Sequence, residues 1–355
     1  MEEQTDIVLI GAGPSGVEMA VGLKRAGYRY VQIEAGQVGA TMAWWPGGTR
    51  WFSSNDRIAI AGVPLVTANQ EKATREEYLA YLRGVVLQFD LPIRLYERVV
   101  RVERVPCPAQ GPGLNAGGGA GFVVVSERRG VERRTGARRV ILSTGGTARA
   151  RRLGIAGEEM GHVSHYLRDP HAYFRQRLLV IGGRNGAVEA ALRCHHAGAA
   201  VSVSYRREAI EEKHIKYWLW PEFEGLVKAG KIGLHLGTVA EEIAAERVVL
   251  RRGDGGKVEV AADFVLVQAG YEADMSLFAG LGVELVGAQG VPRFDAGTME
   301  TNVPGAYVCG TATAGTQERY RVFLENCHVH VERILAALGG GRSGAGEAAY
   351  GRAET

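Results

Sequence analysis

The chain has 355 residues, enough to bury two separate cores, so we expect about two domains. A net charge of +3, with 23% charged residues, indicates neither a nucleic-acid partner nor an anionic membrane surface. No apolar stretch approaches the roughly 20 residues that span a bilayer, and the acidic start is unlike a signal peptide. The four cysteines are widely spaced without a C-x-x-C pair, which predicts no disulfide framework and a place in the reducing cytoplasm.

The first predicted element is a buried parallel strand, Ile7–Ile10, which runs into a glycine-rich loop and then an amphipathic helix. The loop has G-x-G-x-x-G spacing and comprises Gly11, Gly13, Pro14, Ser15 and Gly16 around Ala12. The three glycines allow a tight turn, the approach of a pyrophosphate and close helix–strand packing, and the helix N-terminus supplies amide donors. The pattern predicts a dinucleotide site. The alternative is a glycine-rich turn without a ligand.

A second predicted strand, Tyr30–Ile33, ends at Glu34, which lies 18 residues beyond Gly16. A carboxylate at that place accepts hydrogen bonds from an adenosine ribose, so Glu34 is a candidate cofactor ligand. The aromatic residues of the following loop are suited either to wall a flat ring system or to pack in the core. They are Trp44, Trp45, Trp51 and Phe52.

A helix is predicted over Arg75–Phe89 from its apolar face. Further strands are predicted at Val99–Val105, Phe122–Val125 and Val140–Ser143. Residues 106–121 are rich in Gly, Pro and Ala, which predicts a solvated hairpin loop. The last of these strands stops at Thr144 and Gly145, where we expect the chain to leave the first domain.

A second glycine-rich loop begins 171 residues after the first and again follows a buried strand, Leu178–Ile181. It consists of Gly182, Gly183, Arg184, Asn185, Gly186 and Ala187. Arg184 replaces the middle glycine of the G-x-G-x-x-A form, and its side chain either blocks a pyrophosphate or pairs with a phosphate. The strand Val201–Tyr205 then delivers Arg206 and Arg207 where a NAD enzyme carries an acid. Guanidinium groups there suit the 2′-phosphate of NADPH. A degenerate, ligand-free domain with two solvated arginines is the alternative.

The remaining elements indicate that the chain returns to the first domain. A strand at Phe264–Val267 closes the second series, a strand at Ala306–Cys309 enters Gly310, and a long helix is predicted from about Glu318 to Leu338. We therefore predict an α/β fold with two Rossmann-like domains. Residues 1–150 and 276–338 are predicted to form a discontinuous first dinucleotide-binding domain, residues 151–275 an inserted NADPH domain, and residues 339–355 a disordered tail.

The histidine-containing groups predict no metal site, since none has zinc-ligand spacing. These groups are His162 with His165, His195 with His196, and Cys327 with His328 and His330. Cys194 and Cys327 fall in predicted helices and are interpreted as small buried residues. Two dinucleotide sites in one chain instead indicate electron transfer from one cofactor to the other.

These motifs resemble the thioredoxin-reductase-like flavoproteins over about residues 5–338, and within that class the YpdA-like family of bacterial bacillithiol-disulfide reductases. The resemblance extends to Trp45–Ser54, Val163–Tyr166, Ile215–Trp218 and Leu324–Asn326. It implies FAD on the first loop, Glu34, Thr144, Gly145 and Gly310, and NADPH on residues 182–207. It also places Ala35, Trp45, Thr49 and Val99 in the cofactor sites. A basic residue at the Arg184 position is usual in the family, which favours a working NADPH site.

Three departures from the resemblance bear on mechanism. The region Tyr166–Tyr173, which carries a C-x-x-C pair in thioredoxin reductases, has no cysteine. The redox cysteine proposed for the YpdA-like family is replaced by Ser15, whose hydroxyl ionises far above the thiol value of about 8.5 and cannot form a mixed disulfide. Thr311 replaces the aspartate that many relatives use to hold the FAD ribityl chain, a loss that the family tolerates.

The leading hypothesis is an oxidoreductase that passes electrons from NADPH through FAD to a small acceptor, implied by the resemblance to be a low-molecular-weight disulfide. The helix from Glu318 would direct its positive end at the flavin. Many relatives are dimers, and a homodimer is compatible with the chain.

Three alternatives stay open. A flavin monooxygenase has an F-x-G-x-x-x-H motif, of which Gly161 and His165 match but Glu159 replaces the aromatic residue. A reductase of a small redox protein such as ferredoxin also lacks C-x-x-C, and there the tail with Tyr350 would cover the flavin. A nucleotide sensor without catalysis is the third.

Overall fold

The computed structural model describes residues 3–106, 120–318 and 321–343, which form two compact units. The first unit takes the chain up to residue 43, residues 48–149 and residues from 272 onward, and the second takes residues 44–47 and 150–271. Strands β7 (Arg149–Ala150) and β16 (Tyr271–Glu272) pair where the chain passes from one unit to the other. Each unit has hydrophobic clusters of its own.

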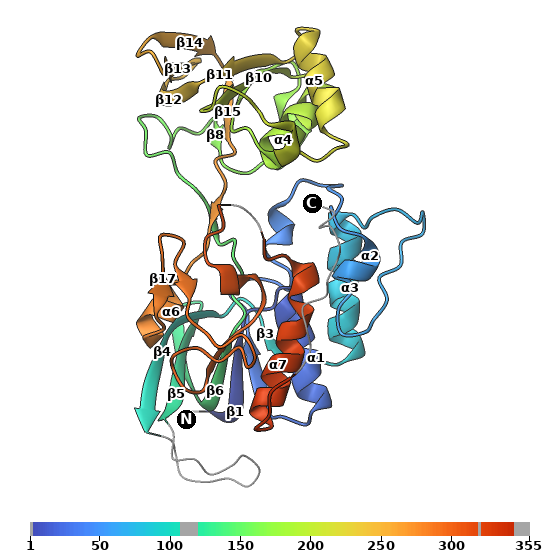
Figure 1. Cartoon of the computed structure of the whole chain (residues 1–355), viewed down its shortest axis with the longest axis vertical. Helices are drawn as coiled ribbons and strands as arrows, with labels where there is room; N and C mark the ends of the chain where they lie inside the picture. Colours follow the sequence, from blue (N-terminus) through green and yellow to red (C-terminus); the bar gives the residue numbers. More distant parts are fainter. Residues whose placement is uncertain (1–2, 107–119, 319–320, 344–355) are drawn as a thin grey trace. The chain divides into compact units, whose positions relative to one another are not determined.

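The first unit is built on a seven-stranded sheet in the order β3-β2-β1-β6-β5-β4, with β19 also paired to β6 (Figure 1). The strands are β1 (Glu3–Ile10), β2 (Tyr30–Ile33), β3 (Ile93–Arg94), β4 (Arg98–Pro106), β5 (Ala120–Arg128), β6 (Val131–Leu142) and β19 (Ala306–Val308). Strands β4 and β5 pair antiparallel, and β1, β2, β3 and β19 join the sheet in parallel. The continuous apolar run of β1 is buried, as is usual for a central parallel strand.

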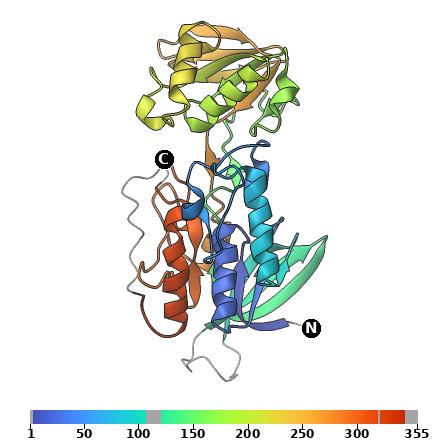
Figure 2. The ribbon, with the colours of Figure 1, turned by 90° about the vertical axis from the view of Figure 1, so that its right-hand side faces the viewer.

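Three helices of this unit, α7, α1 and α3, lie side by side in both views (Figures 1 and 2). The helices are α1 (Pro14–Arg25), α2 (Asn55–Ile58), α3 (Arg75–Gln88), α6 (Ser276–Leu281) and α7 (His328–Leu338). Gly22 allows α1 and α7 to pack closely, because a methyl group there would lie 2.9 Å from Cγ1 of Val331. The smaller elements are η1 (Met42–Trp44), η4 (Gly310–Ala314), η5 (Leu324–Asn326), β17 (Leu285–Val286) and β18 (Val291–Pro292).

The second unit contains a five-stranded parallel sheet in the order β11-β10-β9-β15-β8. Its strands are β8 (Val163–Ser164), β9 (Arg177–Ile181), β10 (Ala200–Tyr205), β11 (Gly233–Leu236) and β15 (Phe264–Val267). An antiparallel sheet follows, with β12 (Thr238–Ile243), β13 (Arg247–Arg252) and β14 (Lys257–Ala261). The helical segments are α4 (Asn185–His196), α5 (Trp220–Lys228), η2 (Pro170–Tyr173) and η3 (Glu212–His214). None of the helices in the described parts of the chain is long and apolar enough to cross a membrane.

The expected helix from Glu318 to Leu338 is wrong at its start, because α7 begins only at His328. Two amide side chains hold the preceding backbone in other conformations. Gln317 Oε1 accepts hydrogen bonds from the N–H groups of Arg321 and Val322 at 2.8 and 3.0 Å, and Asn326 Oδ1 accepts from Phe323 at 2.8 Å. Such local bonds compete with helical ones, so residues 321–323 stay outside the helix.

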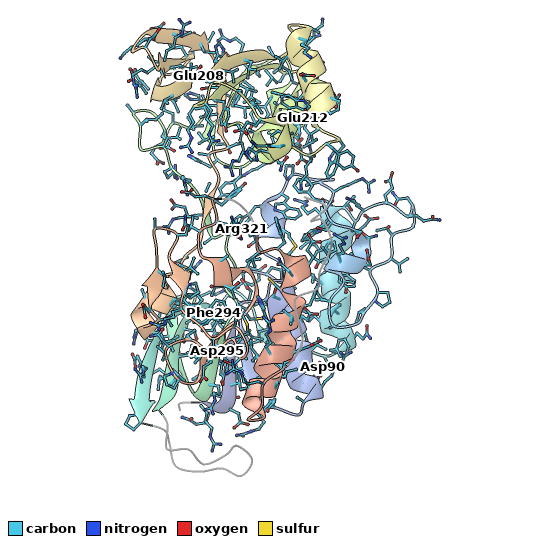
Figure 3. All side chains as sticks on the ribbon, viewed as in Figure 1. Asp90, Glu208, Glu212, Phe294, Asp295 and Arg321 are labelled. Carbon is cyan, nitrogen blue, oxygen red and sulfur yellow. The ribbon has the colours of Figure 1, made fainter. Side chains whose placement is uncertain are left out.

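Two further expectations fall partly outside the described residues. The predicted hairpin loop at residues 106–121 includes residues 107–119, of which nothing is described. Of the predicted disordered tail, residues 339–343 are described, and Arg342 forms an ion pair with Asp295 at 2.7 Å (Asp295 is labelled in Figure 3). Residues 344–355, including Tyr350, lie beyond the described part.

Candidate cofactor-binding sites

The first glycine-rich loop joins β1 to α1, and its three glycines have different environments. A methyl group at Gly11 would lie 2.2 Å from the carbonyl oxygen of Ser143, and Gly11 has a φ of +108°. A methyl group at Gly16 would lie 2.3 Å from the carbonyl oxygen of Gly11. A methyl group at Gly13 would meet nothing within 4 Å among the described residues. Packing therefore explains two of the glycines, whereas Gly13 leaves open space in front of the helix.

That open space lies at the N-terminus of α1. Gly13 is the N-cap residue and Pro14 follows it, and no side chain caps the helix within the described residues. The first-turn N–H groups of such a helix need acceptors and carry a positive dipole end. The loop therefore has the form of an anion cradle.

Glu34 lies beside this loop. Its carboxylate accepts hydrogen bonds from the N–H groups of Ala12 and Gly36, both at 2.7 Å. Ala35 lies between Glu34 and Gly36, and the carbonyl oxygen of Glu34 accepts a hydrogen bond from the N–H of Glu97 at 3.0 Å. Glu97 directly precedes β4, the strand that contains the buried Val99. The predicted acid and its neighbours are thus held together beside the first loop.

Segments far apart in the sequence meet on the other side of the loop. Ser15 packs against Gly310, where a methyl group would lie 2.8 Å from Cβ of Ser15. Thr311 Oγ1 accepts a hydrogen bond from Gly146 at 3.0 Å, next to Gly145 and Thr144. The hydroxyl of Thr144 is buried, with no hydrogen-bond partner among the described residues. A buried hydroxyl without a partner is costly, so a ligand oxygen is a fitting partner for it.

His330 is a residue of this site that the sequence analysis missed. Its Nδ1 accepts a hydrogen bond from the N–H of Gly310 at 3.1 Å, which requires a ring that is unprotonated at Nδ1. Burial, together with the charges of Arg333 and His328, lowers the pKa of His330 to about 4. The sequence offered only its place beside Cys327 and His328, a group for which no metal site was predicted. No cluster of three or more metal-ligating side chains occurs in the described ranges.

The loop that contains Trp44, Trp45 and Trp51 contributes residues 44–47 to the second unit and its remaining residues to the first. Trp44 contacts Tyr166 of the second unit edge to face at 5.4 Å, with both residues in the same compact unit. Trp51 packs on the buried ring of Tyr78 at 4.5 Å, so core packing describes this residue. Thr49 is buried, and its carbonyl oxygen accepts from Arg75 at 2.7 Å. The flavin contacts expected for Trp45 and Thr49 stay predictions.

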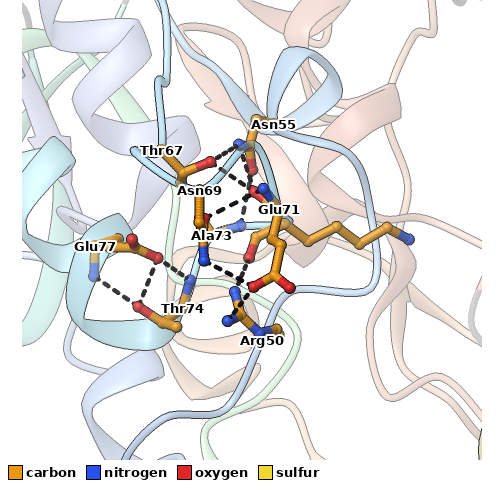
Figure 4. A network of polar contacts seen from close by, with 9 residues as sticks. Arg50, Asn55, Thr67, Asn69, Glu71, Ala73, Thr74 and Glu77 are labelled. Atoms are coloured by element: carbon orange, nitrogen blue, oxygen red, sulfur yellow. Dashed lines mark hydrogen bonds and ion pairs between the residues drawn. The ribbon is translucent and has the colours of Figure 1, made fainter.

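The segment after Thr49 is held by a dense polar network (Figure 4). The side chain of Asn55 donates to Thr67 Oγ1 at 3.0 Å and accepts from the N–H of Ala73 at 2.8 Å. Arg50 pairs with Glu71, and Asn69 donates to the same carboxylate at 2.7 Å. The loop is therefore fixed by hydrogen bonds rather than by regular secondary structure.

The second glycine-rich loop joins β9 to α4. Gly182 has a φ of +152°, and a methyl group there would lie 2.6 Å from the carbonyl oxygen of Gln268. Arg184 is the N-cap residue of α4, with no side chain capping the helix in the described chain. Asn185 Oδ1 accepts from the N–H of Lys216 at 2.8 Å, which ties the loop to the segment before α5. Gly186 and the buried Ala187 complete the first turn.

The register of the strands corrects the expected place of the two arginines. Ile10 pairs with Ile33, and Ile181 pairs with Ser204. The residue in the place of Glu34 is therefore Tyr205, and Arg206 and Arg207 follow it. Tyr205 was not among the predicted site residues, although it directly precedes the arginine pair.

The two arginines themselves are exposed and differ in their contacts. Arg207 lies 3.5 Å from a carboxylate oxygen of Glu211, whereas Arg206 has no ion-pair partner among the described residues. They begin the segment that continues through Glu208 and Glu212, both labelled in Figure 3. Arg206 therefore offers an uncompensated positive charge at the carboxyl end of β10.

Two of the described cysteines have thiols that burial keeps protonated. Cys194, Cys309 and Cys327 are buried, and Cys107 lies outside the described residues. Burial raises the pKa of both Cys194 and Cys309 to about 12. A thiol that stays protonated is a poor nucleophile.

Comparisons with known proteins agree with this arrangement. Residues 8–310 match the family model for pyridine nucleotide-disulphide oxidoreductases. Bacilliredoxin reductase Bdr of Bacillus subtilis is 32% identical over 335 residues, which cover 94% of this chain and 98% of that protein.

Two solved structures extend the comparison. Bacillithiol disulfide reductase Bdr (YpdA) from Bacillus cereus has a TM-score of 0.86 at 31% identity, covering 95% of this chain and 99% of that one. The thioredoxin reductase of T. acidophilum has a TM-score of 0.68 at 18% identity, covering 96% and 99%. The second likeness shows the fold: a thioredoxin-reductase-like α/β arrangement of two units.

Proposed function

The chain belongs to the pyridine nucleotide-disulphide oxidoreductase family, and from that premise we propose that it passes electrons from NADPH, by way of FAD, to a low-molecular-weight disulfide. Membership makes it an oxidoreductase that uses a flavin and a nicotinamide nucleotide. The proposal of FAD and NADPH is supported chiefly by one observation. The same strand–loop–helix arrangement occurs twice, with the carboxylate of Glu34 at the first loop and two arginines beside the second.

FAD is the flavin that fits the first cradle, because the loop is suited to a dinucleotide. The N-terminus of α1 and the open space at Gly13 would take the pyrophosphate. The carboxylate of Glu34 would bind the adenosine ribose. An oxygen atom of FAD would give the buried hydroxyl of Thr144 a hydrogen-bond partner. When bound, the flavin supplies the two-electron chemistry, and the protein supplies position and electrostatics.

NADPH is the donor that fits the second cradle. Arg206 and Arg207 lie at the carboxyl end of β10, one and two residues beyond the place of Glu34 in the first unit. Guanidinium groups bind a phosphate with charge-assisted hydrogen bonds, and a 2′-phosphate is what distinguishes NADPH from NADH. Two arginines and no acid at this place support NADPH.

The proposed acceptor is a low-molecular-weight disulfide, as in the solved relatives named for bacillithiol disulfide. The balanced reaction is NADPH + H⁺ + RSSR → NADP⁺ + 2 RSH. Ser15 stands where the family cysteine is expected, the described cysteines are buried, and burial raises the pKa of Cys194 and Cys309 to about 12. The acceptor would therefore receive its electrons without forming a mixed disulfide with this chain.

One experiment separates this proposal from its rivals. The purified protein is first denatured to test for released FAD, and the native protein is then reduced anaerobically with NADPH. Reoxidation is followed with bacillithiol disulfide, with O₂ and with ferredoxin. Fast reoxidation by the disulfide supports the proposal. A long-lived oxygen adduct would favour a monooxygenase, ferredoxin-dependent turnover a protein partner, and the absence of flavin would overturn the proposal.

A further inference from the structure

We propose that Tyr205 and Gly183 act as a matched pair that makes the second cradle select a 2′-phosphorylated nucleotide. This inference rests on the proposed use of NADPH. It assigns a specificity-determining role to two residues beneath the ribose position, in addition to the arginines that would bind the phosphate.

Equivalent backbone hydrogen bonds show which residues of the two glycine-rich loops correspond to each other. The N–H of Gly11 donates to the carbonyl oxygen of Ile33 at 2.8 Å, and the N–H of Gly182 donates to that of Ser204 at 2.9 Å. The strand registers agree with this correspondence. It follows that Gly183 corresponds to Ala12, and Tyr205 to Glu34.

The corresponding residues contact each other in both units, but in different ways. In the first, the Glu34 carboxylate accepts a hydrogen bond from the N–H of Ala12 at 2.7 Å. In the second, the ring of Tyr205 covers Gly183, and a methyl group at Gly183 would lie 2.3 Å from the ring carbons. Gly183 does not have a positive φ, so its backbone would accept an alanine. Tyr205 is the reason that this residue is a glycine.

A tyrosine in place of a glutamate changes the groups that can bind a ribose. A carboxylate binds the 2′-hydroxyl of an unphosphorylated ribose and repels a 2′-phosphate. In the second unit a phenol ring fills that place, so the 2′-hydroxyl loses its acceptor. The exposed charges of Arg206 and Arg207 then face no acid at residue 205, and a 2′-phosphate can use both.

The test uses two fragments that differ only in the phosphate, 2′,5′-ADP and 5′-AMP, bound to the full-length protein and measured by calorimetry. Wild type is expected to bind 2′,5′-ADP about tenfold or more tightly than 5′-AMP, because charge-assisted bonds contribute that much. Tyr205→Glu is expected to reduce this preference about tenfold. Tyr205→Phe, which keeps the ring, should leave it within about twofold of wild type.

A second pair of variants tests the packing. Gly183→Ala alone should weaken both fragments or lower Tm, because the methyl group collides with the ring. Combined with Tyr205→Glu, it should recover a folded protein that prefers 5′-AMP. Unchanged preference in Tyr205→Glu, or wild-type behaviour of Gly183→Ala, overturns the inference. If wild type binds neither fragment, the proposed use of NADPH fails and takes this inference with it.

Discussion

The glycines of the first loop show how one residue type serves two purposes at the residue scale. Gly11 and Gly16 have backbone oxygens 2.2 and 2.3 Å from where a methyl group would lie, so the protein itself requires them. Gly13 has no such neighbour among the described residues, so packing does not explain it. The same argument separates Gly182, which packing requires, from Gly183, which Tyr205 requires.

Gly13→Ala should therefore abolish flavin binding while leaving the apoprotein nearly as stable as wild-type apoprotein. Its methyl group would occupy the space in front of α1, and the loss of an N-cap glycine costs at most about 1 kcal/mol. Flavin content is measured by absorbance after denaturation, and stability by urea unfolding. Gly16→Ala is the matched control and should unfold far more easily. Full flavin content in Gly13→Ala would contradict the assignment.

Ser15→Cys should give the protein a reactive thiol. The residue lies in the first turn of α1, and a helix N-terminus lowers the pKa of a cysteine below about 8.5. The rate of alkylation against pH measures that pKa, and turnover with bacillithiol disulfide measures the consequence. Ser15→Ala serves as the control that removes the hydroxyl without adding a thiol. A cysteine that does not react below pH 8.5 would show that Gly310 packs over it too closely.

His330 should make stability depend on pH below neutrality. Its pKa falls from 6.5 to about 4 on folding, so the unfolded chain binds more protons between these values. The contribution is fully present above pH 6.5 and is lost as the pH falls toward about 4, by up to about 3 kcal/mol. Urea unfolding at pH 7 and pH 4.5 measures the difference, and His330→Gln should reduce it.

His328 opposes this trend with the other sign. Burial alone lowers its pKa, but the hydrogen bond and charge of Glu18, with a bond to the carbonyl oxygen of Arg57, raise it above 6.5. A raised pKa stabilises the fold at low pH, and that contribution is lost as the pH rises through the folded value. A steeper acid dependence in His328→Gln than in wild type would distinguish the two residues, and no difference would contradict this account.

At the scale of elements, polar side chains decide where helices begin. Thr74 and Glu77 form a capping box at α3: Thr74 Oγ1 accepts from the N–H of Glu77 at 3.2 Å, and the Glu77 carboxylate accepts from the N–H of Thr74 at 2.7 Å. At α7, Gln317 and Asn326 satisfy backbone groups without a helix, so the helix begins ten residues later than predicted. Side-chain hydrogen bonds to backbone N–H groups thus mark the start of α3 and keep the residues before α7 out of a helix.

Thr74→Ala should lower the free energy of unfolding by about 1 kcal/mol, since the first turn of α3 loses its cap. Thr74 belongs to the network shown in Figure 4 and forms a β-bridge with Arg50, so loosening should extend to the loop that contains Arg50 and Asn55. Urea unfolding measures the loss, and hydrogen exchange of residues 50–74 measures the loosening. Thr74→Ser keeps the hydroxyl and should stay close to wild type. An equal loss in both variants would argue against the cap.

At the scale of the whole molecule, the chain forms two units with separate cores. The clusters around Leu178 and Leu179 lie within residues 150–271, and the cluster around Val8 lies within the first unit. A core that one continuous segment completes by itself can support independent folding.

Residues 150–271 expressed alone should therefore unfold cooperatively and bind 2′,5′-ADP within about threefold of the full chain. Loss of the contacts of Trp44 with Tyr166 and of Gly47 with Arg193 should lower stability without preventing folding. Thermal melting and calorimetry are the measurements. The fragment with Leu266→Ala, which empties part of the buried core, should lose about 2–5 kcal/mol and serves as the control. A fragment without a melting transition would show that the first unit is needed.

What the sequence by itself determined was local: apolar runs predicted the central strands, and glycine spacing predicted both cradles. These signals suffice because burial and tight turns restrict the residues at each position directly. Tertiary structure alone decided which distant groups meet, such as His330 with Gly310, and which residue of the second unit corresponds to Glu34. Strand register and hydrogen bonds between distant residues set these outcomes, and neither leaves a periodic pattern in the chain. The start of α7 was missed for a different reason, because short-range side-chain bonds of Gln317 and Asn326 hold the backbone before it outside a helix.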